Sequence, residues 1–294
     1  MEESARQAAL SDLYSLPGHL LWRSAARVDA EIARLLPGRA DLHAYAALLA
    51  LAQEEPLSQQ SLANMCGVSG TTMTSVGESL QRDGLVERIR NPADRRSYAL
   101  TRTTAGRAAV RRWEPDVRGL EDRLTTPLTD AEVLRLRKHL CSVVGDQLDE
   151  RTPQALLDST GFLISRGHAV MHRELLTALE PLRIEPRHFG TMRALRAAGP
   201  VTQGQLGALL DVSPASVVQI VDHLQDLGLV ERQRDPDDRR AYRLHLLPPS
   251  AAVLTEASAV ADTLNDDRYG GPRTRARADL VRLLQKFLTA PVER

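Results

Sequence analysis

The sequence predicts a mainly α-helical protein in which one domain-sized unit occurs twice, and each unit contains a small β-hairpin. The stretch NPADRRSY at 91–98 returns as DPDDRRAY at 235–242, which is 144 positions later. Immediately before it, GLVERIR at 84–90 returns as GLVERQR at 228–234 at the same spacing. A length of 294 residues fits two domains of about 150 residues each. The aromatic content of 3% argues against a β-sandwich.

We therefore expect copy one to span 1–150 and copy two to span 151–294. Apolar residues at helical spacing predict that each copy opens with two helices. These helices are expected at 12–36 and 41–53 in copy one and at 155–180 and 186–198 in copy two.

A helix-turn-helix follows in each copy. In copy one, Ser58 can cap a short helix that stops at Gly67, and Ser69 can cap the next helix. The corresponding residues of copy two are Thr202, Asp211 and Ser213, followed by Pro214 in the first turn. A helix, a short turn and a second capped helix make this motif.

The second helix of each pair has an apolar face and an uncharged polar face. The apolar stripe should face the core, and it consists of Met73, Val76 and Leu80 in copy one and Val217, Ile220, Val221 and Leu224 in copy two. Near the N-terminus, the other face and its caps carry Ser69, Gly70, Thr71, Thr74 and Ser75 in copy one and Ser213, Pro214, Ala215, Val218 and Gln219 in copy two. Small, uncharged or donor groups suit a surface that lies against base edges, whereas a solvated surface is usually richer in Lys and Glu. We therefore expect these residues to bind DNA, with a merely exposed face as the alternative.

A β-hairpin with an arginine pair at its tip follows each helix-turn-helix. Short β-prone runs flank the turn-forming residues, so this segment is a predicted wing. The tip arginines, which could reach a phosphate or a narrow minor groove, are Arg95, Arg96, Arg239 and Arg240. Asp94 and Asp238 are placed to hold one neighbouring Arg by a charge-assisted bond. The alternative is a network that only rigidifies the turn.

The element order, the GLVER strands and the DRR tips resemble the MarR family of winged helix-turn-helix transcription regulators. The stretch TTAG at 103–106 also matches the family's T-x-x-G at the start of the helix after the wing. Copy two departs from this pattern, because Leu247 and Ser250 replace the Thr and Gly and Pro248-Pro249 begins the helix. Family members are typically homodimers of subunits about as long as one copy. The resemblance therefore implies two winged helix-turn-helix domains joined by a helical dimerisation-type region, as a dimer fused into one chain.

The segment between the copies fits such a fusion. Helices are predicted at 103–124 and 129–149, the second opened by Thr129 with Glu132 nearby, and a short polar linker follows at 149–154. Tethering gives the two copies an effective concentration of roughly millimolar, so we expect a monomeric pseudo-dimer.

The resemblance implies a sequence-specific repressor that binds double-stranded DNA at an imperfect inverted repeat and is released by a small lipophilic or phenolic effector. The alternative is a winged-helix protein-interaction module that has lost DNA binding. Hydroxyls in copy one can bond to several bases, whereas Gln219 suits adenine and Ala215 and Val218 suit the thymine methyl. We therefore expect unlike half-sites, with the copy-two half favouring A·T pairs.

Effector clefts in the family lie between the dimerisation helices and the winged domain. Residues that could line them here are His19, Trp22, Tyr45, Trp113, Arg166, His168 and Phe189. For each of them, ordinary core or surface is the alternative.

Other function classes have little support in the sequence. No nucleophile and base constellation, phosphate-binding Gly loop or clear metal set appears, so we expect neither an enzyme nor a cofactor. Cys66 is expected in the core and Cys141 in a helix, and two cysteines give no disulfide framework. His168 and His172 are four apart on a helix but lack a convincing third metal ligand. No signal peptide or membrane-spanning run is visible, which predicts a cytoplasmic protein with no membrane partner.

Overall fold

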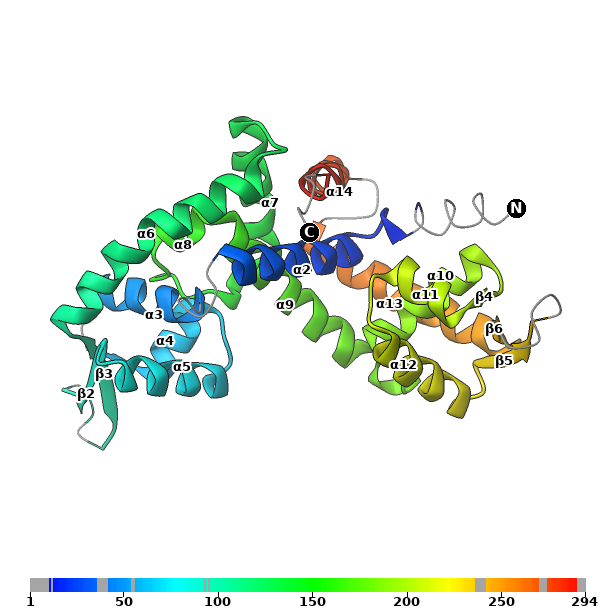
Figure 1. Ribbon diagram of the computed structural model, residues 1–294, viewed down its shortest axis with the longest axis horizontal. Coiled ribbons are helices and arrows are strands. Elements are labelled where there is room, and N and C mark those ends of the chain that lie inside the picture. The colour runs from blue at the N-terminus through cyan, green and yellow to red at the C-terminus, as the bar shows by residue number, and fades with distance from the viewer. Residues whose placement is uncertain are drawn as a thin grey trace. The chain divides into compact units, whose positions relative to one another are not determined.

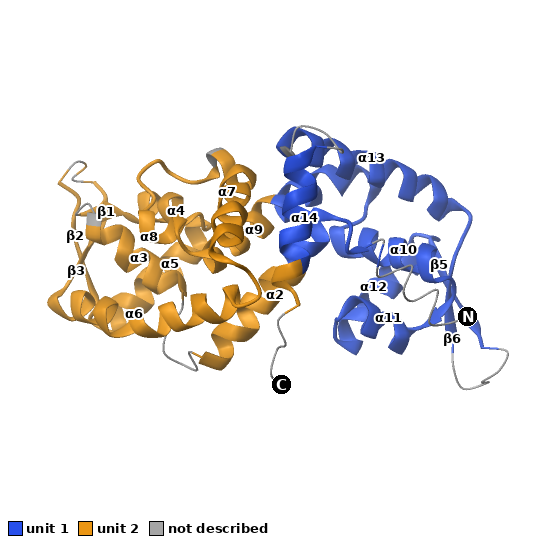
Figure 2. Cartoon of the chain, turned by 90° about the horizontal axis from the view of Figure 1, so that it is seen from above, with its two compact units in different colours: residues 1–22, 171–285 blue, residues 23–170, 286–294 orange. Residues whose placement is uncertain are grey.

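The computed structural model describes residues 11, 13–35, 42–53, 56–92, 94, 96–235, 242–269 and 274–289 (Figure 1). The chain divides into two compact units, and each unit takes segments from both sequence copies (Figure 2). The copy-one unit comprises Arg23–Val170 and Lys286–Arg294, and the copy-two unit comprises Met1–Trp22 and Met171–Gln285. The two units are defined by the packing of the chain, whereas the two copies are defined by the sequence repeat. The copy boundaries at 150 and 151 therefore stay a prediction.

The copy-one unit contains a helix-turn-helix and a three-stranded antiparallel sheet. Its elements, with α2 and α9 reaching beyond it, are α2 (Pro17–Leu35), α3 (Leu42–Gln53), β1 (Leu57–Ser58), α4 (Gln59–Cys66), α5 (Gly70–Arg82), β2 (Val86–Arg90), β3 (Tyr98–Arg102), α6 (Thr104–Thr125), α7 (Asp130–Val144), η1 (Gly145–Gln147), α8 (Gln154–Leu157) and α9 (Thr160–Leu179). The strand order is β1-β3-β2, and the register pairs Arg90 with Tyr98 and Arg88 with Leu100.

The copy-two unit repeats this arrangement. Its further elements are η2 (Glu180–Leu182), α10 (Pro186–Ala198), β4 (Val201–Thr202), α11 (Gln203–Leu210), α12 (Pro214–Asp226), β5 (Val230–Arg234), β6 (Tyr242–Leu246), α13 (Pro249–Tyr269) and α14 (Arg275–Phe287), whose last two residues belong to the copy-one unit. Its strand order is β4-β6-β5, and Arg234 pairs with Tyr242. Two mainly helical units with small antiparallel sheets confirm the predicted fold class.

Helix boundaries agree with the prediction except at some ends. The first predicted helix is interrupted, because a turn at 14–16 separates the helical residues 11 and 13 from α2. The helix α2 begins at Pro17, and proline is favoured in the first turn of a helix. The opening helix of copy two is split, since α8 ends before Asp158 and the hydroxyl of Ser159 then accepts a hydrogen bond from Phe162 N at 3.2 Å. The helix predicted to reach 149 ends at Val144, where Gly145 takes a positive φ of 56°.

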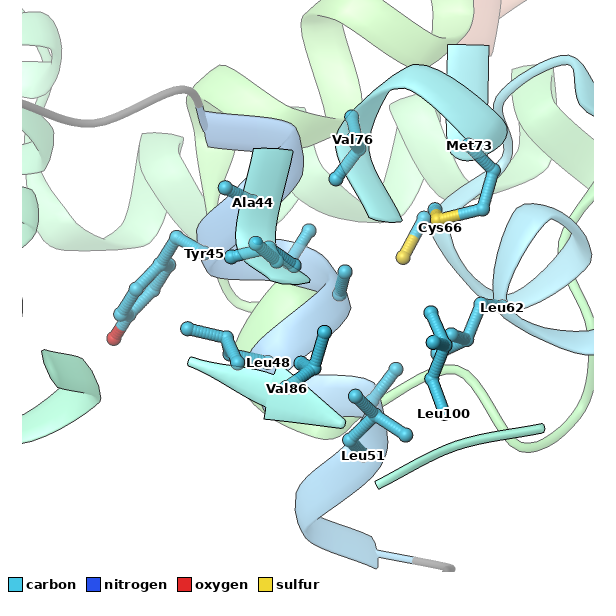
Figure 3. Packing of buried hydrophobic residues seen from close by; sticks show 14 of the residues in the cluster. Ala44, Tyr45, Leu48, Leu51, Leu62, Cys66, Met73, Val76, Val86 and Leu100 are labelled. Atoms are coloured by element: carbon cyan, nitrogen blue, oxygen red, sulfur yellow. The ribbon is translucent and has the colours of Figure 1, made fainter. Parts of the chain in front are cut away.

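Buried aliphatic residues of α3, α4, α5 and the sheet form the copy-one core (Figure 3). The predicted stripe residue Met73 is fully buried, and Cys66 belongs to the same core cluster. Tyr45 lies at the margin of the cluster, and its hydroxyl points away from the packed side chains (Figure 3). The equivalent stripe of α12 is buried in the core of the copy-two unit, which confirms the predicted inward faces of both helices.

The helix after the copy-one wing begins in very close contact with the strand before it. Thr103 caps α6 by accepting a hydrogen bond from Gly106 N at 3.0 Å, and Thr103 N donates to Leu85 O at 3.1 Å. A Cβ atom on Gly106 would lie 2.1 Å from the Leu85 carbonyl oxygen. The T-x-x-G spacing therefore has a steric reason, because only glycine leaves room for that carbonyl.

Copy two starts the equivalent helix without this motif. Leu247 N donates to Leu229 O at 2.9 Å, which preserves the backbone bond made by Thr103 in copy one. The helix α13 begins at Pro249, and the buried Ser250 donates its hydroxyl to Leu247 O at 2.6 Å. A side chain is thus accommodated in copy two at the position where copy one requires glycine.

The C-terminal residues of the described chain complete the packing of the copy-one unit. Phe287 is fully buried, and the guanidinium of Arg27 lies 4.4 Å from its ring centroid and donates to its carbonyl. Lys286 Nζ lies 2.5 Å from Glu132 Oε2. Glu132 also closes a capping box with Thr129, as its position in the sequence suggested.

No single helix in the described ranges has the length and apolar character needed to cross a bilayer. The helices α11 and α12 meet that criterion only when taken as a pair, and they are bent by 110° relative to each other.

Candidate nucleic-acid interface

The turn between α4 and α5 is fixed by residues that follow position 150. Gly67 ends α4 in the left-handed conformation at a φ of 60°, and its carbonyl accepts a hydrogen bond from Arg166 Nη1 of α9. The buried hydroxyl of Thr152 donates to Met65 O at 3.0 Å. These contacts satisfy carbonyls that the end of a helix leaves without an intrahelical partner. The start of α5 is therefore held in place by residues of the second sequence copy.

The N-terminal half of α5 presents an exposed, uncharged surface. Ser69 caps the helix by accepting from Thr72 N at 3.0 Å. Thr74 donates its hydroxyl hydrogen to Gly70 O at 2.9 Å, so that its oxygen can act as an acceptor toward a base donor. The predicted contact residues Gly70, Thr71, Thr74 and Ser75 are all exposed. No ionisable group interrupts this surface before Glu78.

The helix α12 presents a different surface at the same place. Asp211 takes the left-handed conformation at a φ of 57°, where copy one has glycine, and Asp is one of the few residues that tolerate it. Ser213 then caps α12 by accepting from Ser216 N at 3.2 Å. The predicted contact residues Pro214, Ala215, Val218 and Gln219 are all exposed, and Val218 has 44% of its surface accessible. A large apolar side chain exposed beside a glutamine suits contact with thymine and adenine.

The copy-one wing tip is described in part. Arg96 is exposed, and its backbone N–H donates to Asp94 Oδ1 at 3.0 Å. Ser97 N donates to Asp94 O at 2.9 Å, so Asp94 shapes the turn through both its side chain and its backbone. Arg95 lies outside the described residues, as do Asp238, Arg239 and Arg240 of the copy-two tip. The charge-assisted Asp–Arg bonds therefore stay a prediction.

The wings carry exposed residues that the sequence reasoning missed. Tyr98 is 41% exposed, and the guanidinium carbons of Arg88 and Arg90 lie 4.4 and 4.6 Å from its ring centroid. The equivalent Tyr242 is 45% exposed. The alternating arginines of VERIR opposite a tyrosine could have indicated this cluster, because cross-strand partners share a face of the sheet.

The proposed effector residues fall in several environments. Trp113 and Phe189 are buried in the cores of their units, and Tyr45 lies at a core margin. His19 lies between two rings, with centroids 5.7 Å from Tyr14 and 5.5 Å from Trp22. Arg166 contacts the turn before α5, and His168 is half-buried two residues further along α9. Their role as effector ligands stays a prediction.

The two thiols have different surroundings. Burial raises the pKa of Cys66 to about 12, against a smaller opposing effect of Arg166, which fits the core role predicted for this residue. Cys141 is exposed on α7, and partial burial and the nearby Asp158 raise its pKa. Within the described ranges, no three His, Cys, Asp or Glu side chains are grouped to hold a metal ion.

Both units thus combine a capped helix that has an exposed, uncharged N-terminal face with a hairpin that carries exposed arginine. This combination defines the winged helix-turn-helix class of nucleic-acid-binding proteins. The sequence profile of the MarR family matches residues 42–98 and again residues 184–241. The chain belongs to the MarR family, carries the family's domain in two tandem copies, and is a DNA-binding transcription regulator.

The chain is similar in sequence or fold to the following proteins. A Thauera aromatica protein, provisionally assigned as the transcriptional regulatory protein for the hcr operon, is 25% identical over 153 residues, which are 52% of this chain and 92% of that protein. The crystal structure of a MarR-family regulator from Rhodococcus sp. RHA1 is 25% identical, with a TM-score of 0.43 over 47% of this chain and 99% of that one. BpsR of Bordetella bronchiseptica, whose DNA binding is regulated by 6-hydroxynicotinic acid, is 23% identical, with a TM-score of 0.41 over 45% of this chain and 94% of its own.

Proposed function

We propose that the chain is a repressor that binds an imperfect inverted repeat as a monomeric pseudo-dimer. The observation that carries this proposal is the presence of two exposed helix faces that occupy equivalent positions but differ in chemistry. Two covalently linked winged helix-turn-helix domains need not associate from separate chains before they bind DNA, because the covalent link already holds them together. Recognition helices of such regulators enter successive major grooves about one helical turn apart.

The side chains on α5 and α12 support unlike half-sites. In α5 the exposed Thr71 and Ser75 hydroxyls can donate or accept, and they discriminate weakly among bases. In α12 the amide of Gln219 can bond an adenine edge in two places, while Val218 offers a methyl-sized apolar contact to thymine. The copy-two half-site should therefore be richer in A·T pairs than the copy-one half-site.

Selection of bound duplexes from random DNA tests this proposal. We expect two half-sites in inverted orientation that differ in sequence. The variant Gln219→Ala should relax the selected motif in the A·T-rich half alone, and Ser75→Ala should change only the other half. Recovery of a perfect palindrome, or a change in both halves from either variant, would contradict the assignment.

We also propose that a small lipophilic or phenolic effector releases the DNA. Support comes from the contact between Arg166 and the Gly67 carbonyl, because a compound that displaces this guanidinium would free the turn that precedes α5. The test is a screen of phenolic compounds against the complex with the selected operator, with release of DNA as the readout. The alternative function, a protein-interaction module, predicts that no duplex is retained at any salt concentration.

A further inference from the structure

Arg88 and Arg232 occupy equivalent positions in the two wings. Arg88 pairs with Leu100 across the copy-one hairpin, and Arg232 pairs with Leu244 across the copy-two hairpin. Directly opposed residues project from the same face of a sheet, and both leucines are buried core residues. Each arginine therefore leaves the hairpin on the face that packs toward the recognition helix of its own unit.

The two arginines have different partners. Arg88 stacks on Tyr98 with its guanidinium carbon 4.4 Å from the ring centroid, and it makes no ion pair within the described part of the chain. Arg232 is bound to α12 instead. Its Nη2 lies 2.5 Å from Asp222 Oδ1, and its Nη1 donates to Gln225 Oε1.

These partners lie on the exposed side of the recognition helix. Asp222 and Gln225 are two and three turns after the helix begins, and both are exposed. Copy one has Glu78 and Gln81 at the equivalent positions, and Glu78 makes no ion pair within the described ranges. The charge composition of the two sites is thus the same, but only the copy-two arginine is engaged by its helix.

We propose that Asp222, with Gln225, holds Arg232 away from the DNA backbone. The copy-two winged domain therefore binds phosphates more weakly than the copy-one winged domain does. The inference rests on the proposed function and adds that the side chain of Arg232 is restrained by α12. Both terminal nitrogens of Arg232 are already bonded to α12, and Nη2 lies 2.5 Å from a carboxylate oxygen, so this guanidinium offers a phosphate fewer donors and a more fully compensated charge. Arg88 gives up only a ring contact, which leaves its donors available along the wing edge.

Replacing Asp222 by asparagine tests this restraint. Binding of the wild-type protein and the D222N variant to the selected operator is measured by fluorescence anisotropy at salt concentrations from 50 to 200 mM. We expect D222N to bind several-fold more tightly at 50 mM. One additional phosphate contact steepens the salt dependence by about 0.9 in the log–log slope, so this advantage should shrink by about threefold at 200 mM.

Matched variants separate release of Arg232 from simple removal of a negative charge. Glu78→Gln removes the equivalent carboxylate from α5, and we expect it to raise affinity less than D222N does. In an Arg232→Ala background, Asp222→Asn should give no more than the Glu78→Gln effect. Equal effects of D222N and E78Q, or an undiminished D222N effect without Arg232, would overturn the restraint while leaving the proposed function intact. A wild-type protein that retains no duplex would instead overturn the proposed function and this inference together.

Discussion

Substitution of Gly106 by alanine should destabilise the copy-one unit and leave the copy-two unit folded. The new Cβ would lie 2.1 Å from the Leu85 carbonyl oxygen and 3.1 Å from its carbon. The oxygen would have to move by about 1 Å to reach ordinary contact, and Leu85 O also accepts from Thr103 N. Overpacking against a side chain costs typically 1–3 kcal/mol, and a backbone neighbour yields less, so we expect a loss of at least about 3 kcal/mol.

The two tryptophans allow this loss to be assigned to one unit. Trp113 is buried in the copy-one core, and Trp22 belongs to the copy-two unit. Urea unfolding followed by the fluorescence of Trp113 in a Trp22→Phe background reports the copy-one unit, and linear extrapolation gives the free energy of unfolding. The matched control is Ser250→Ala, because copy two already holds a side chain at the equivalent position, and we expect it to cost less than about 1.5 kcal/mol.

Two outcomes of this experiment would contradict the steric role of Gly106. A Gly106→Ala protein whose free energy of unfolding lies within about 0.5 kcal/mol of the wild-type value would show that α6 can begin elsewhere without loss of stability. Equal losses from the alanine substitutions at both positions would also refute the explanation, because only the copy-one site lacks room.

Two further changes test buried polar groups. Burial, with a smaller effect of His223, lowers the pKa of His188 to about 4. As the pH falls below about 6.5, the unfolded chain therefore binds a proton at this histidine before the folded chain does. Between pH 6.5 and 5 the free energy of unfolding of the wild type should fall by about 2 kcal/mol, and a His188→Gln variant should not show this loss. Parallel pH dependences of the two urea midpoints would contradict this. Replacing Thr152 by valine leaves the Met65 carbonyl without its buried donor, so the free energy of unfolding should fall by about 1–2 kcal/mol. Thr152→Ser keeps the hydroxyl and should stay near the wild-type stability. Equal thermal midpoints of all three proteins would show that this hydrogen bond does not stabilise the fold.

Much of the fold could be predicted because its signals are local. The caps Ser69 and Ser213 act within one helical turn, and each makes the predicted hydrogen bond to the backbone. The stripes of α5 and α12 are buried as their periodicity requires. The repeat itself identified both hairpins, because a turn of seven residues between β-prone runs leaves few other arrangements.

The remaining features depend on contacts between residues far apart in the sequence. Arg166 reaches the carbonyl of Gly67 across 99 positions, and no pattern near either residue indicates this pair. Arg232 bonds a carboxylate, whereas the equivalent Arg88 stacks on a tyrosine ring, although the sequences of the two copies are almost identical there. The packing of each hairpin against its helix decides between these two contacts. Such long-range choices follow from tertiary packing and not from propensity or periodicity.

The exchange of terminal segments limits how this protein can be divided. Leu13 of the first copy is buried in the core of the copy-two unit, while Phe287 of the second copy is buried in the copy-one unit. Cutting the gene at the linker would give two halves, and each would lack a piece of core that the other half encodes. The two halves of the sequence are therefore not self-sufficient, because each half contributes terminal residues to the unit that the other half mainly forms.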